Sequence, residues 1–211
     1  MPTPAQLTDF RRSLKGLDYT RKRMEGLCRA QQITRRDLNS VYEALFLRAV
    51  SRFESFLEEL FLGILQGRVE YKKNRRVTLK VAPTSRQALI HIVFQKNSYL
   101  DWLPFSKTED RADYYLLGAR PFSDLEQPDK DAISKIVIIR NAIAHHSKHS
   151  ANQFKTKVIQ SQPLLRGEKT PAGYLRSEVQ PNINRFEAYI GELGRIAAHL
   201  CSPTPPPKRY P

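Results

Sequence analysis

Apolar residues recur with a helical period through most of this chain, beginning near its N-terminal end. Between about Ala5 and Ala30 they gather on one side of a helix, and the opposite side is rich in Arg and Lys. The apolar positions are Leu7, Phe10, Leu14, Leu17 and Met24. A break follows around Gln31, and Thr34 with an acid three residues later, Asp37, has the pattern of a helix start. The pattern predicts a long amphipathic helix and the start of a second one.

The second helix, from about Asp37 to Leu65, has a wide apolar stripe. The stripe consists of Tyr42, Phe46, Ala49, Phe53, Phe56, Leu57, Leu60 and Ile64. The residues on the other side are Arg48, Arg52, Ser55 and Glu59. Glu54 lies at the edge of the stripe, where it is either the counter-ion of a buried arginine or a solvated carboxylate. Gly67 is expected to end this helix.

Shorter elements occupy the middle of the chain. A helix is predicted from Pro83 to about Lys96, and its inward-facing residues are expected to be Ala88, Leu89, Ile92 and Val93. The aromatic stretch from Tyr99 to Phe105 reads as a turn, and Asp110 to Leu117 as a short helix. A loop from Pro121 to Gln127 leads to a further helix that starts at Pro128 and runs to about His146.

The helical pattern weakens in the C-terminal third. Phe154 to Leu165 suits a strand pair or irregular chain, and Gly167, Pro171 and Gly173 mark turns. A last helix is expected from about Asn182 to Leu200, with a core face formed by Phe186, Ile190, Leu193, Ile196 and Ala197. We therefore predict an all-α helical bundle with an irregular or short β segment in this third. Residues 1–202 would form one domain, and residues 203–211, with five prolines, an unpacked tail.

Charge adds a candidate partner to this picture. The 211 residues include 35 Lys and Arg against 21 Asp and Glu, a net charge of +14, which favours polyanions such as RNA. A basic stretch follows Gly67, and we expect an exposed loop with a short extended piece from Val77 to Val81. Its candidate RNA-binding residues are Arg68, Lys72, Lys73, Arg75 and Arg76, although a run of cations is more often merely solvated.

An arginine interrupts the apolar stripe of the helix that begins at Pro128. At 100° per residue, Ile136, Val137, Ile143 and Ala144 lie within about 80° of Ile133, and Arg140 falls in the middle of that arc. Burying an unpaired guanidinium costs roughly several kcal/mol, because the guanidinium cannot lose its proton and become neutral. Arg140 is therefore expected either to pair with a carboxylate in the core or to line a cleft and act on an anion.

Polar groups follow this arginine at the end of the helix. Asn141 and His145 are separated by four residues and lie on one flank beside Arg140. His146 is expected to face another surface or to lie at the helix end, where cations are favoured. Lys148 is a candidate phosphate contact, and Glu54 a candidate counter-ion. The candidate catalytic residues are thus Arg140, Asn141 and His145, with His146, Lys148 and Glu54 in support.

The order Arg140-Asn141-x-x-Ala144-His145, late on an apolar helix of a basic helical chain, resembles the motif of the HEPN superfamily. The segment from Arg48 to Leu60 also looks like the helix that precedes the motif helix in several HEPN groups. The resemblance covers roughly Asp37 to His146. A bare Arg-x4-His pattern is weak, and the Asn, the Ala before the His and the helical context make it more specific.

The resemblance implies a metal-independent endoribonuclease with no cofactor. An imidazole can accept the proton of the RNA 2′-hydroxyl near neutral pH, and a guanidinium offers planar donors to the phosphate. By this interpretation His145 and Arg140 take these roles, and Asn141 orients His145 or donates to a phosphate oxygen. The expected products carry a 2′,3′-cyclic phosphate and a 5′-hydroxyl.

The resemblance also implies an assembly. Sites of this family are composite, so a chain with one such domain would act as a homodimer. The role expected is that of a toxin or a stress or phage-defence effector, with a nucleotidyltransferase-like antitoxin as a further partner. Two widely spaced cysteines, Cys28 and Cys201, favour a reduced, cytoplasmic location, and no apolar run approaches the roughly 18 residues of a membrane span.

Other functions fit the sequence less well. Some HEPN domains are not catalytic, so the main alternative is a module that binds RNA or a partner protein, with the basic loop as its contact surface. A metal site made of His145, His146 and His149 has no acid cluster or cysteine pair to support it. A hydrolase with a nucleophilic serine or cysteine has no matching motif in this chain.

Overall fold

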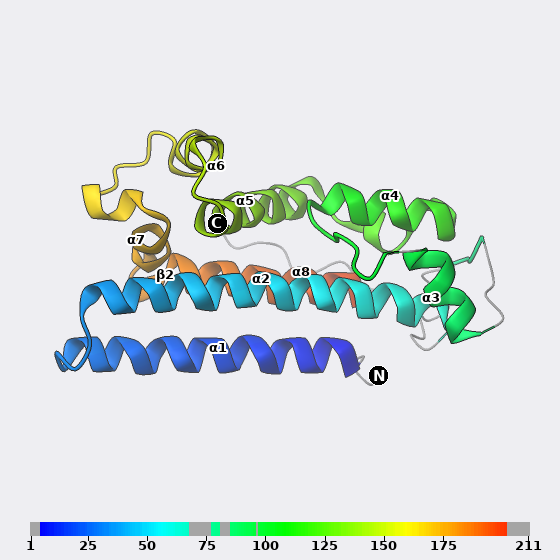
Figure 1. Cartoon of the computed structure of the whole chain (residues 1–211), viewed down its shortest axis with the longest axis horizontal. Helices are drawn as coiled ribbons and strands as arrows, with labels where there is room; N and C mark the ends of the chain where they lie inside the picture. The colour runs from blue at the N-terminus through cyan, green and yellow to red at the C-terminus, as the bar shows by residue number, and fades with distance from the viewer. Residues whose placement is uncertain (1–4, 68–76, 81–84, 96, 202–211) are drawn as a thin grey trace. The chain divides into compact units, whose positions relative to one another are not determined.

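The computed structural model describes residues 5–67, 77–80, 85–95 and 97–201, and over these the chain is all-α with a short β segment in its C-terminal third (Figure 1). The α-helices are α1 (Ala5–Arg29), α2 (Arg35–Leu65), α3 (Arg86–Phe94), α4 (Phe105–Tyr115), α5 (Gln127–Ala144), α6 (Lys148–Gln153), α7 (Pro171–Arg176) and α8 (Arg185–Cys201). The strands β1 (Glu178–Gln180) and β2 (Ile183–Asn184) pair antiparallel across a tight turn. None of the described helices has the length and apolar character needed to cross a membrane.

The chain divides into two compact units. The first comprises Met1–Phe10, Phe53–Asp131 and Arg195–Pro211, and the second comprises Arg11–Arg52 and Ala132–Gly194. Helices α1, α2, α5 and α8 each contribute residues to both units. All residues of the second unit are described, whereas the predicted Pro-rich tail, residues 203–211, lies outside the described residues.

The start of α2 follows the expected capping pattern. The backbone N–H of Thr34 donates to Asp37 Oδ2 at 2.9 Å, and the backbone N–H of Asp37 donates to Thr34 Oγ1 at 3.2 Å. These two bonds satisfy amide groups that have no partner within the helix. After Leu65, Gly67 adopts a φ of 66°, the left-handed conformation that favours glycine at the end of a helix. The whole apolar stripe predicted for α2 is buried.

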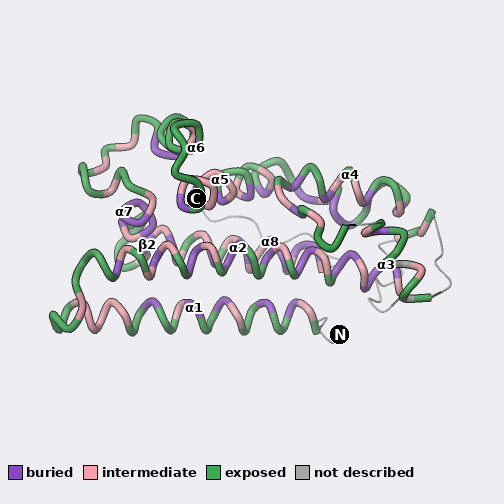
Figure 2. The backbone as a smooth tube through the Cα atoms, viewed as in Figure 1, coloured by how far each residue is buried: buried purple, intermediate pink, exposed green. Residues whose placement is uncertain are grey.

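A core of aromatic and aliphatic side chains holds the second unit together. The ring of Phe186 from α8 packs edge-on against Tyr42 of α2 with centroids 5.5 Å apart, and Phe46 lies beside it at 6.4 Å. Figure 2 shows buried residues along one side of α1 and exposed residues along the side turned away from α2. This segregation is what the amphipathic pattern of α1 predicts.

One arginine of α1 lies on the buried side. Arg21 is only 3% exposed, and its guanidinium bonds to Asp18, Glu25 and Glu187 at 2.7–3.0 Å. Tyr42 donates its hydroxyl proton to Glu25 in the same cluster. The hydrogen bonds from Lys22 and Arg21 lower the pKa of Asp18 even though burial acts to raise it. Arg21 is thus a buried cation paired with three half-buried acids, and this pairing offsets the cost of burying its charge.

The first unit is built around Trp102. This ring is 1% exposed, lies 5.3 Å from the ring of Phe61, and donates its indole N–H to Glu58 at 2.8 Å. The guanidinium of Arg111 stacks 4.4 Å above the tryptophan ring. Residues Val77–Lys80 contribute an isolated antiparallel bridge between Leu79 and Leu116, where the sequence predicts a short extended piece.

A second buried ion cluster in the first unit joins α5 to α8. Asp129, in the first turn of α5, is 3% exposed and bonds to Arg195. Its other carboxylate oxygen lies 3.1 Å from Nδ1 of His199, which is 4% exposed. The position also suits a carboxylate, because the N-terminal end of a helix favours negative charge.

Three details differ from the sequence-based expectation. Phe154 to Ile159 is a π-helical turn that continues α6, so a strand pair at 154–165 is wrong; the strands come later, at Glu178–Asn184. Helix α4 begins at Phe105 instead of Asp110, directly after Pro104, which is its N-cap residue and has an extended backbone. Ile92 of α3 is 39% exposed, so only part of the expected inward face is buried.

Candidate active site at the end of α5

The buried face of α5 is rotated relative to the predicted one. Ile133, Ile136 and Ile139 are fully buried and Ile143 is 9% exposed, whereas Ala144 is exposed. On a helical wheel this shifts the centre of the buried arc toward Ile139 and away from Ala144. Arg140 therefore lies near the edge of the arc and is half-buried. Its position fits the boundary of the core, where a guanidinium stays in reach of water.

The guanidinium of Arg140 contacts the two other predicted residues. Its Nη1 donates to Oδ1 of Asn141 at 3.0 Å and lies 3.5 Å from Nε2 of His145. Within the described residues Arg140 forms no ion pair with a carboxylate. A guanidinium can only donate, so a hydrogen bond between these groups requires His145 to accept at Nε2 with its proton on Nδ1.

His145 lies immediately after the helix. Helix α5 ends at Ala144, and the backbone N–H of His145 still donates to the carbonyl of Asn141 at 2.9 Å. This bond keeps the imidazole on the flank of Arg140 and Asn141 while leaving it exposed to solvent. The grouping that the sequence predicts from helical spacing is thus present, with His145 held by the last helical hydrogen bond.

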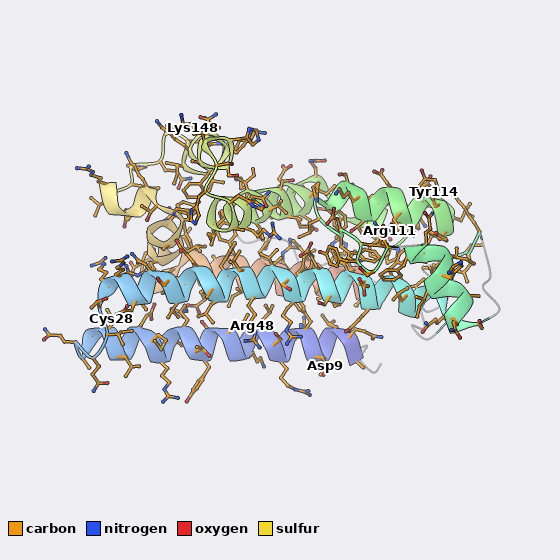
Figure 3. All side chains as sticks on the ribbon, viewed as in Figure 1. Asp9, Cys28, Arg48, Arg111, Tyr114 and Lys148 are labelled. Atoms are coloured by element: carbon orange, nitrogen blue, oxygen red, sulfur yellow. The ribbon has the colours of Figure 1, made fainter. Side chains whose placement is uncertain are left out.

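The segment after His145 presents more positive or protonatable groups. His146, Lys148 and His149 are all exposed. Ser147 caps α6 by accepting from the backbone N–H of Ser150 at 3.1 Å, which fixes the start of this helix at Lys148. Figure 3 shows Lys148 on the outer side of α6. Lys148 therefore lies three residues after His145 and is exposed to solvent.

A carboxylate that the sequence analysis missed lies in the same unit. Glu43 of α2 is half-buried, and burial raises the pKa of its side chain above the ordinary value. A positive charge on His146 opposes part of that rise. No local pattern marks Glu43, because its relation to His146 depends on the packing of helices more than a hundred residues apart in sequence.

The remaining candidate residues have different surroundings. Glu54 belongs to the first unit, is half-buried, and accepts a hydrogen bond from the Tyr99 hydroxyl at 3.5 Å. The predicted RNA-binding residues Arg68, Lys72, Lys73, Arg75 and Arg76 lie outside the described residues. Within the described part of the chain, no three His, Cys, Asp or Glu side chains are arranged to hold a metal ion.

Comparison of the chain with models of known protein families gave no match, and comparisons with curated proteins and with solved structures gave none either.

Proposed function

We propose that this protein is a metal-independent endoribonuclease of the HEPN type, with Arg140, Asn141 and His145 as its catalytic group. The observation that supports the proposal is the contact of Arg140 with both Asn141 and His145 at an exposed helix end, with no carboxylate partner for Arg140 within the described residues. An arginine held by neutral groups keeps its charge available for an anion.

The proposed reaction is an internal transesterification. A base removes the 2′-hydroxyl proton, the 2′-oxygen attacks the adjacent phosphorus, and the bond from phosphorus to the 5′-oxygen breaks. The leaving oxygen takes a proton, which gives a 2′,3′-cyclic phosphate and a 5′-hydroxyl. His145 is the proposed base, Arg140 stabilises the charge on the phosphorane oxygens, and Asn141 holds Arg140 through its amide oxygen.

The same chemistry supports a homodimer. One imidazole cannot act as base and acid in the same step, so a second protonated group must serve the leaving oxygen. We propose that the partner's His145 supplies it across a two-fold axis, with both copies of Arg140 on one phosphate. The specific activity of such an enzyme falls on dilution below its dimer dissociation constant, and a sedimentation experiment reports the mass of two chains.

Charge in the second unit supports RNA as the substrate. This unit contains 20 Lys and Arg residues against eight Asp and Glu residues, whereas the first unit has 15 against 13. Almost all of the net positive charge therefore belongs to the unit that holds Arg140 and His145. Such a field attracts a polyanion at long range. A role as a toxin or defence effector, with a nucleotidyltransferase-like antitoxin, stays a prediction.

The test is cleavage of single-stranded RNA by the purified protein in EDTA. His145→Ala should lower the rate by about 10²–10⁴-fold, because it removes the proton acceptor. Arg140→Lys should lower it by about 10²-fold, because it keeps the charge but loses the planar pair of donors. End-group analysis should detect the cyclic phosphate.

The matched control is His149→Ala, an exposed histidine four residues away on α6. It should cleave like the parent protein, and circular dichroism should show the same helix content in all variants. RNA cleavage that survives His145→Ala would contradict the proposal. If the parent protein binds RNA tightly and never cleaves it, the alternative of a non-catalytic RNA-binding module is favoured.

A further inference from the structure

A ridge of exposed side chains with a spacing of four residues follows the free side of α1. We define the α1 ridge as Arg11, Lys15, Tyr19 and Arg23; all four are exposed, and Tyr19 is 70% exposed. Figure 2 shows the exposed side of α1 turned away from α2, and Figure 3 shows nitrogen-tipped side chains extending from that side. With a rise of about 1.5 Å per residue, successive members lie about 6 Å apart.

The acids of this part of α1 do not neutralise the ridge. Between Arg11 and Arg29 the helix has two acids, Asp18 and Glu25, and both bond to the buried Arg21. Asp18 also forms an ion pair with Lys22, whose Nζ lies 2.8 Å from Asp18 Oδ2. Within the described residues the three cations of the ridge have no ion-pair partner. Arg11 and Lys15 are like charges four residues apart, which slightly destabilises a helix, so helix stability does not account for this pair.

The composition of the ridge fits single-stranded RNA. Proteins that bind single strands without sequence preference combine cations that follow the phosphate backbone with exposed aromatic rings on which bases stack. Arg11, Lys15 and Arg23 supply the first element along about 18 Å of helix, and Tyr19 at the centre supplies the second. A tyrosine ring also suits a membrane interface or a protein interface, so the experiment has to separate these partners from RNA.

We propose that the α1 ridge is an RNA-binding surface separate from the candidate active site. In the second unit, as viewed in Figure 1, α2 lies between α1 and α5. The ridge belongs to α1 and His145 follows α5, so the two groups are carried by different helices. The ridge therefore holds a segment of RNA away from the scissile bond. This inference rests on RNA as the substrate in the proposed function. It requires only that the protein bind RNA, whether or not it also cleaves it.

The test uses a single-stranded RNA with 2′-O-methyl groups, which lacks the nucleophile and stays intact whether or not the protein is a nuclease. Binding is followed by fluorescence anisotropy from low to high salt. The triple variant R11Q/K15Q/R23Q should bind about 10–100-fold more weakly, and its slope of log K against log salt should be shallower by about 2, since each lost phosphate contact removes roughly 0.7. Gln keeps the helix propensity of the replaced residues.

The matched control, K107Q/R120Q/K130Q, removes the same net charge from cations of the first unit that are paired with Asp101, Asp124 and Glu109. It should leave the salt slope unchanged. Tyr19→Ala should weaken binding by about tenfold and Tyr19→Phe should not, because stacking needs only the ring.

Equal losses in the two triple variants, or a parent protein that does not bind the RNA, would overturn the assignment. So would a ridge variant that keeps RNA binding but loses attachment to phosphatidylserine vesicles. Loss of binding in the ridge variant together with a parent that never cleaves RNA would overturn the proposed nuclease and support the ridge. If the parent cleaves RNA and the ridge variant binds RNA normally, the result would support the nuclease and overturn the ridge.

Discussion

At the scale of single residues, the arrangement that matters most for the proposed function is the contact of Arg140 with Asn141 and His145 at the end of α5. The spacing of Arg140, Asn141 and His145 was sufficient to predict that they share one flank, and they are in contact. The sequence placed Arg140 in the middle of the apolar arc, whereas burial of Ile139 rotates the arc. A run of adjacent isoleucines and a valine leaves the helical phase ambiguous, because several rotations bury similar apolar area.

The ion pairs of Arg21 show more clearly what cannot be predicted from the sequence. Arg21 lies on the core side of α1. The sequence does not distinguish it from the many exposed Arg and Lys residues of the same helix. Its burial depends on Glu187, which is 166 residues away in sequence. Pairings of this kind require the tertiary fold, so the sequence of α1 alone could not predict them.

Glu43 gives a prediction on the pH dependence of stability. Burial raises the pKa of this carboxyl in the folded protein above its ordinary value of 4.5, so the folded state holds a proton that the unfolded state has lost. The Glu43 contribution to the free energy of unfolding therefore decreases as the pH rises above 4.5 and through the raised value. Glu43→Gln removes this dependence.

Urea unfolding at two pH values checks the prediction. The Glu43→Gln variant should match the parent below pH 4.5, where the carboxyl is protonated in both states, and should be more stable than the parent at pH 7. A variant that is less stable than the parent at pH 7 would mean that attraction between Glu43 and His146 outweighs the cost of burial.

At the scale of elements, long helices with strong caps were predictable and short ones were not. The Thr34 and Asp37 pattern and the apolar stripe of α2 specify that helix locally, and both are present in the structure. The π-helical turn at Phe154–Ile159 has too few residues for a periodic pattern, which explains why the sequence equally suggested strands. The pairing of Asp129 with Arg195 and His199 was likewise not visible, because the partners are 66 and 70 residues away.

The cap of α2 yields a prediction about an element boundary. Thr34→Ala removes the hydroxyl that accepts from the backbone N–H of Asp37, and it should lower the free energy of unfolding by about 1 kcal/mol. The urea midpoint measures this loss. Ser40→Ala is the matched control, because Ser40 lies within α2, is exposed, and donates only to the carbonyl of Arg36. It should leave stability unchanged or slightly raised, and an equal loss in both variants would argue against the cap.

At the scale of the whole molecule, total charge was readable from composition but its distribution was not. The sequence indicates a basic loop at residues 68–80 as the most conspicuous run of cations. The first unit, to which residues 68–80 belong, has nearly equal numbers of cations and acids. The second unit has a large excess of cations. Many of those cations lie along α1, where the sequence shows them as the polar side of an amphipathic helix and not as an uninterrupted run.

The continuity of four helices through both units has a consequence for how the chain can be dissected. Excising either unit would sever α1, α2, α5 and α8, so a truncation that keeps Arg140 and His145 also discards the ends of the helices that support them. We expect calorimetry of the intact chain to show a single melting transition, with equal van't Hoff and calorimetric enthalpies. Two separate transitions would show that the units melt independently. Substitutions in the full-length chain, and not deletion fragments, are thus the informative way to locate its activity.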